Sequence, residues 1–137
     1  AEAILGAYDT QSDLCVLDFL REVDYGPDEN QPDDLVIARI GEAALEAWDK
    51  NAVPPPEWNV SPDALVAEWA SLLRVLSAPA GSPPVLIVTS NGIARFVLDV
   101  VTKTECDLQS IKLKTGAYGL IRTRPEGATL LEWNIRP

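Results

Sequence analysis

The chain has 137 residues, of which 47% are hydrophobic, and this suffices for one domain, residues 1–137, with a core of its own. Its 21 acidic and 11 basic residues give a formal charge of −10, and such a surface repels nucleic acid and anionic membranes. No apolar run approaches the roughly 18 residues of a membrane span. We therefore expect a cytoplasmic protein with no nucleic-acid and no membrane partner.

The cysteine and histidine content argues against a metal site or a disulfide framework. Cys15 and Cys106 are few and far apart, and the chain contains no histidine. We expect two buried, reduced thiols, no metal and no other cofactor.

The first third of the chain predicts helices around a short strand. Residues 1–9 open in a helical pattern with no capping residue ahead of them, which is typical of the end of a helix. Residues 14–17 (LCVL) have the pattern of a short buried strand, and residues 19–26 (FLREVDYG) that of a loop. Apolar residues at helical spacing then predict one helix over 33–48.

A proline-rich loop over 51–60 separates this helix from the next, because proline removes backbone donors and fixes φ. We expect Trp58 to fold back over the protein from this loop. Ser61 then caps a second helix with Pro62 in its first turn, and the prolines at 79–84 end it.

The rest of the chain predicts a strand, a turn, a helix and a β-rich tail. Residues 85–88 (VLIV) are uniformly apolar, as in a strand covered on both faces, and a turn leads from them into a helix. β-like stretches follow at 111–113, 118–124 and 129–135. The whole predicts an α/β fold with a layered, mostly parallel sheet, flanking helices and an antiparallel carboxyl-terminal tail.

The turn after residues 85–88 is a candidate anion site. Open α/β sheets bind ligands beyond the carboxyl ends of their strands, and free amides at a helix start favour an anion. Ser90, Asn91 and Gly92 lie there, and Arg95 is one turn further on. Two simpler interpretations stay open: these residues serve to cap an ordinary turn, and Arg95 pairs with Asp99 on the surface.

Two segments give the chain a family resemblance. VLIVTSNGIARFVLDVV resembles the late strand, turn and helix of the histidine phosphatases, V-[ST]-H-G-x-x-x-R, and FLREVDYG resembles their L-x-E-x-x-x-G segment. AEAI, AWD and RVLSA fall in the expected order, so the resemblance covers the whole chain. It implies a phosphoglycerate mutase-like fold, here without its amino-terminal strand and part of its first helix.

The resemblance also implies roles for individual residues. It makes Glu22 the acid that protonates the leaving group, although an exposed carboxylate paired with a neighbouring cation is the simpler interpretation. The second family histidine is replaced, by Ser90 in an ungapped alignment or by Asn91 if the glycines are matched. The residues implied in phosphate binding are Ser90, Asn91, Gly92, Arg95 and, although its side chain is expected to be solvated, Arg21.

The absence of histidine bears on activity, because a phosphohistidine mechanism needs a neutral imidazole to attack phosphorus. We expect a family member that acts on or binds phosphorylated small molecules or inorganic phosphate, with this chain itself inactive. The alternative is a degenerate, non-catalytic module that binds phosphate or another protein.

The resemblance predicts self-association as well. Without the family's first strand, residues 85–88 lack a neighbour on one side and leave backbone groups unpaired. We expect a homodimer that pairs exposed sheet edges, or else a sheet in which the carboxyl-terminal strands cover the gap.

Overall fold

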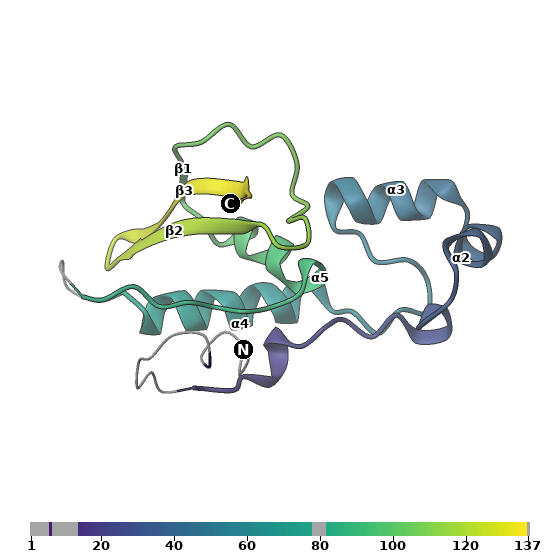
Figure 1. The fold of residues 1–137 in the computed structure, drawn as a ribbon, viewed down its shortest axis with the longest axis horizontal. Coiled ribbons are helices and arrows are strands. Elements are labelled where there is room, and N and C mark those ends of the chain that lie inside the picture. The colour runs from purple at the N-terminus through teal and green to yellow at the C-terminus, as the bar shows by residue number, and fades with distance from the viewer. Residues whose placement is uncertain (1–5, 7–13, 78–81, 137) are drawn as a thin grey trace.

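The computed structural model describes residues 6, 14–77 and 82–136 (Figure 1). Of the predicted helix over 1–9, all but Gly6 lies outside these residues. The described helices and strands are α2 (Asp33–Ile40), α3 (Glu42–Asn51), α4 (Pro62–Val75), α5 (Asn91–Ala94), β1 (Lys103–Thr104), β2 (Tyr118–Arg124) and β3 (Gly127–Ile135). Short 3-10 helices cover Asp18–Leu20, Gly26–Asp28 and Arg95–Asp99.

The single helix predicted over 33–48 is two helices, α2 and α3. Gly41 separates them with φ of 81° and ψ of 154°, a conformation that glycine adopts without a steric penalty. The two helices form a lobe that projects from the rest of the molecule in Figure 1. Val36 and Trp48 are its buried side chains, and Ile37 is 36% exposed.

The loop over 51–60 folds back as predicted, and Trp58 anchors it. The Trp58 ring meets Tyr25 and Trp48 edge-on, with centroids 4.7 Å and 5.3 Å away. Its Nε1 donates a hydrogen bond to buried Asp28, 2.7 Å away. Arg39 also donates to this carboxylate and, as the larger cause, holds the pKa of Asp28 below its ordinary value.

Helix α4 begins at Pro62 as predicted, although the Ser61 side chain makes no capping hydrogen bond. Trp69 and Leu73 are its buried residues. The Trp69 Nε1 donates to the carbonyl oxygen of Ile93 at 3.0 Å, so α4 is fixed against α5. The core continues into the sheet through Phe96 and Leu130, which are 1% and 0% exposed.

The prediction of a mostly parallel sheet is not confirmed. The described sheet has the order β1-β3-β2, and its long pair, β2 with β3, is antiparallel, as expected for the tail. Parallel pairing is limited to the two residues of β1 beside β3. The stretch 111–113 is not a strand.

The strands predicted over 14–17 and 85–88 are also not formed. Both segments lack strand pairing, and the carboxyl-terminal strands do not cover residues 85–88. A strand needs a neighbour for its backbone hydrogen bonds, and the described residues place none beside either segment. The prediction that both cysteines are buried is wrong: Cys15 is exposed and Cys106 is partly exposed. Both thiols are free, as predicted.

None of the described helices is long and apolar enough to cross a membrane.

Candidate functional site

Glu22 lies against the turn formed by residues 90–92, where α5 begins, although Glu22 and Gly92 are 70 residues apart. The Glu22 Oε1 atom lies 2.8 Å from the position that a Cβ atom on Gly92 would take. Any side chain at residue 92 would therefore displace the carboxylate or crowd Val23 behind it. Because Gly92 has no side chain, the exposed Glu22 carboxylate can lie directly against the backbone of the turn.

The side chains of the turn have partners of their own. Ser90 Oγ accepts a hydrogen bond from the Ile93 amide at 3.3 Å and so caps α5. Asn91 Oδ1 accepts from the Leu113 amide at 2.9 Å and ties the following loop to the turn. Among the described residues, the amides of Asn91 and Gly92 have no acceptor, and they are the donors left for a ligand.

Arg95 is buried rather than directed at the mouth of the turn. It is 2% exposed, its Nη1 donates to the carbonyl oxygen of Trp48 at 2.5 Å, and its guanidinium carbon lies 4.2 Å from the Trp48 ring centroid. Nη2 has no hydrogen-bond partner among the described residues. Burial lowers the pKa of Arg95, and the described residues form no ion pair between it and Asp99.

Tyr25 completes the surroundings of the acid. Its hydroxyl donates to Glu22 Oε1 at 3.2 Å, and the Val23 amide donates to the same oxygen at 3.0 Å. Burial and then the charge of Glu22 raise the pKa of Tyr25 to about 12, and the charge of Arg95 acts in the opposite direction. The Glu22 carboxylate is thus held by two donors and lies in the field of a buried cation.

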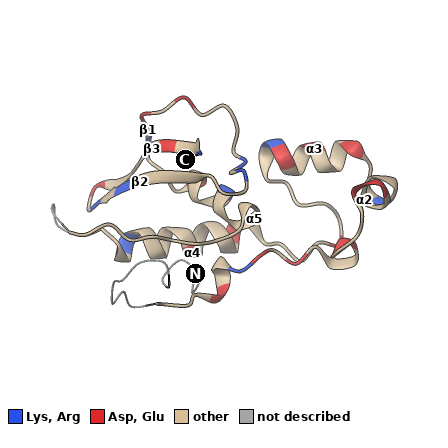
Figure 2. Ribbon diagram, viewed as in Figure 1, with Lys and Arg blue, Asp and Glu red and all other residues tan. Residues whose placement is uncertain are grey.

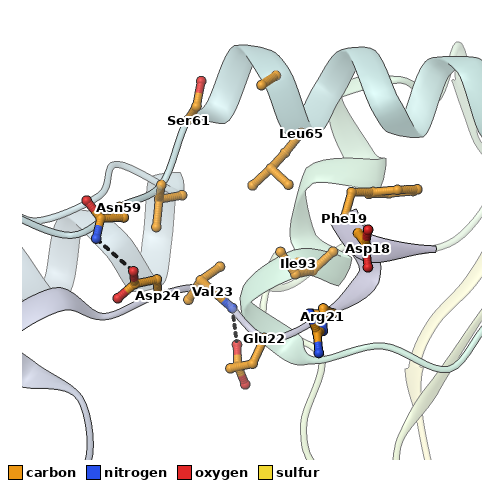
Figure 3. A pocket seen from close by; sticks show the side chains of 12 residues that line it. Asp18, Phe19, Arg21, Glu22, Val23, Asp24, Asn59, Ser61, Leu65 and Ile93 are labelled. Carbon is orange, nitrogen blue, oxygen red and sulfur yellow. Dashed lines mark hydrogen bonds between the residues drawn. The ribbon is translucent and has the colours of Figure 1, made fainter. Parts of the chain in front are cut away.

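A hollow of about 330 Å³ lies behind this arrangement, between the 18–24 segment and the start of α4 (Figure 3). Leu65 and Ile93 face it, whereas the Glu22 carboxylate lies on the other side of its own backbone. Arg21 is exposed at the rim. The structure therefore brings Glu22 and the turn together but leaves Arg21 beside the hollow.

A second hollow, of about 310 Å³, lies on the sheet and is lined by basic residues. Lys103, Arg122 and Arg124 surround it, together with Glu105 and Glu126. Lys103 pairs with Glu105 at 2.6 Å. This groove is an alternative anion site of small net positive charge, because three cations face two carboxylates in it.

Glu22, the extended segment 85–88 and the turn 90–92 follow one another along the chain in the order of the motifs of one family. The model of the histidine phosphatase superfamily (branch 1) matches residues 1–136. The chain belongs to the histidine phosphatase superfamily. No curated protein and no solved structure gives a significant match to it.

Membership in the superfamily indicates a chemistry of phosphorylated molecules. Among the described residues, no group of three or more acidic or cysteine side chains could hold a metal ion. The donors near Glu22 are the Val23 amide, the Tyr25 hydroxyl and the free amides of Asn91 and Gly92.

Sequence reasoning missed Tyr25, although a signal was present. A tyrosine three residues after the predicted acid, next to a glycine that bends the chain, can fold its hydroxyl back onto the carboxylate. It also missed the contact between Arg95 and the Trp48 carbonyl, since a backbone acceptor leaves no trace in the residue pattern.

Proposed function

We propose that this superfamily member binds the phosphoryl group of a small phosphorylated molecule, or inorganic phosphate, at residues 90–92, where α5 begins. The observation that supports the proposal is the closeness of Glu22 to Gly92, because the family resemblance implies that Glu22 is the acid and Gly92 contributes one of the two free amides of the turn. The amides of Asn91 and Gly92 would donate to phosphoryl oxygens. Arg95 would contribute its charge from beneath the turn without touching the phosphate, because its side chain is buried.

In this proposal Glu22 protonates the leaving oxygen of a phosphate ester. Its hydrogen bonds from Tyr25 and the Val23 amide occupy Oε1, so Oε2 is the atom that would carry the proton. The attacking nucleophile has to be supplied from outside these 137 residues, because they contain no histidine. The chain alone would bind phosphate without hydrolysing its esters.

The test joins a turnover assay with a binding assay. We expect no hydrolysis of a generic phosphomonoester, no phosphohistidine after incubation with a labelled one, and weak, salt-sensitive binding of radiolabelled inorganic phosphate in equilibrium dialysis. Turnover that exceeds a purification blank and is lost in Glu22→Gln would show that the chain is an enzyme as it stands. Absence of phosphate binding at low ionic strength would refute the site.

The non-catalytic module remains the second candidate. The engaged side chains of Ser90 and Asn91 favour it, since one of these two residues stands where an active member would carry a histidine. A longer natural product that hydrolyses phosphomonoesters would favour the enzyme, and phosphate binding without hydrolysis in that product would favour the module.

A further inference from the structure

Three consecutive residues fix the loop that joins β1 to β2. Each of them binds a different element, and the contacts, all of 2.9 Å, are Lys112 Nζ to both carboxylate oxygens of Asp49 in α3, the Leu113 amide to Asn91 Oδ1 in the turn, and the Lys114 amide to Asn134 Oδ1 in β3. Because the partners come from three separate parts of the chain, they hold residues 112–114 in one place. The bond to Asn91 puts this segment against the candidate site.

The same loop is basic only where it meets the turn. Over residues 105–117 the acidic side chains, Glu105 and Asp107, lie near β1, whereas the two basic ones, Lys112 and Lys114, flank the residue that binds Asn91. Figure 2 shows acidic residues on the arc of the loop near β1 and basic residues where the loop descends toward α5. The loop therefore brings positive charge to the turn on a chain of net charge −10.

Lys112 and Lys114 differ in how far they are engaged. The Lys112 ammonium pairs with Asp49, and its side chain is 46% exposed. The Lys114 side chain is exposed and makes no ion pair or hydrogen bond with any described residue. An ammonium on a flexible four-carbon stem can turn toward an anion without movement of the backbone. Lys112 thus anchors the loop, and Lys114 carries the charge that a ligand can engage.

An anion at the turn needs such a charge. Glu22 lies against Gly92 and repels it, and the field of the whole chain adds to the repulsion. Arg95 attracts it from beneath, but this side chain is 2% exposed and does not reach the ligand. Lys114 is one residue from the bond to Asn91 and is exposed to solvent, so it can contact an anion that the turn amides hold.

We infer that Lys114 is a phosphate-binding residue of this site and that the contacts of residues 112–114 position it. The inference rests on the proposed function. The Lys114 ammonium donates to a phosphoryl oxygen on the solvent side, while the amides of Asn91 and Gly92 donate to the others. The Asn91 side chain holds the loop through Leu113 and does not bind the ligand itself.

The experiment is a titration of inorganic phosphate into the ¹³C,¹⁵N-labelled chain, repeated on Lys114→Gln, Lys114→Arg and Lys50→Gln. Lys50→Gln is the matched control, because it removes one positive charge from an exposed lysine of α3 that pairs with Glu46. We expect Lys114→Gln to raise the dissociation constant by at least roughly fivefold, the effect of one unit charge at contact distance in water. Lys114→Arg should restore most of the affinity. Lys50→Gln should change it by less than about twofold, since salt screens a distant exposed charge.

The ¹³Cε resonance of Lys114 reports the contact directly, and a role in stability alone would not move it. Its absence from the spectrum of Lys114→Gln identifies it, and we expect it to shift with phosphate at the same dissociation constant as the turn amides. Turn amides that shift while ¹³Cε does not, or equal losses of affinity in Lys114→Gln and Lys50→Gln, overturn the inference and leave the proposed function standing. Turn amides that stay unmoved in the parent overturn both, because no phosphate then lies within reach of Lys114.

Discussion

Replacing Glu22 by glutamine should tighten phosphate binding if the acid faces the bound anion. The amide keeps an oxygen that can accept from Tyr25 and from the Val23 amide, so the local structure is expected to persist. What changes is one negative charge beside Gly92. The substitution therefore isolates the electrostatic effect of the acid on the turn.

The size of the effect follows from Coulomb's law. Two unit charges about 4 Å apart interact by about 1 kcal/mol in bulk water, and by about 4 kcal/mol at the effective dielectric constant of a protein surface. Glu22 is exposed, so the lower value applies. We expect Glu22→Gln to lower the dissociation constant for inorganic phosphate by at least roughly fivefold, since 1.4 kcal/mol corresponds to a factor of ten.

The assay is isothermal titration calorimetry with inorganic phosphate at low ionic strength, near neutral pH. Glu42→Gln is the matched control, because it makes the same chemical change at an exposed residue of α3, far along the chain from the turn. Equal affinities for Glu22→Gln and Glu42→Gln would show that only net charge matters and would refute the placement of phosphate beside Glu22. Weaker binding by Glu22→Gln would refute it as well.

Three further predictions concern the stability of the same region and of the core. Gly92→Ala should destabilise the fold by ~1–3 kcal/mol in urea unfolding, because the new methyl group meets Glu22 and Val23. Adding Glu22→Ala should restore part of the lost stability. Strict additivity of the two free-energy changes would contradict the contact between residues 22 and 92. Burial, and then the charge of Glu22, raise the pKa of Tyr25, so the folded state keeps a proton that the unfolded chain loses. Stability should therefore fall as pH rises from 10 toward about 12, and Tyr25→Phe should flatten that slope; an unchanged slope would argue against the burial of Tyr25 beside Glu22. Leu130→Ala should cost ~2–5 kcal/mol, since the side chain is 0% exposed, and a loss under 1 kcal/mol in the same assay would mean that the core is loose there.

The sequence correctly predicted the elements that depend on residues close to one another in the chain. Proline in the first turn predicted the start of α4 correctly, and the proline run predicted the loop that Trp58 anchors. The β-like stretches at 118–124 and 129–135 predicted β2 and most of β3 in an antiparallel tail, and these two strands are neighbours in sequence. In each case the partners lie within one short stretch of the chain.

Predictions that depended on distant partners did less well. Residues 85–88 have a strand's composition, but a strand also needs a neighbour, and the residue pattern cannot show whether one is present. The single helix predicted over 33–48 contains Gly41, whose positive φ ends α2 and redirects the chain into α3. The buried position of Arg95 depends on a carbonyl 47 residues away.

The candidate site was predictable only through the family. Spacing alone could not bring Glu22 to Gly92, because 70 residues and several elements lie between them. The order of the family motifs implied that both belong to one site, and the structure places them in contact. The capping bond of Ser90 and the bond from Leu113 to Asn91 could not be predicted, since each depends on the local path of the backbone.

The central claim is that phosphate binds at the turn beside Glu22, and the most direct measurement is a phosphate titration followed by amide resonances of the ¹⁵N-labelled chain. We predict saturable shifts of the Asn91 and Gly92 amides, reproduced by sulfate and not by chloride at equal ionic strength. Shifts confined to the groove of Lys103, Arg122 and Arg124, with the turn resonances unmoved, would contradict the claim.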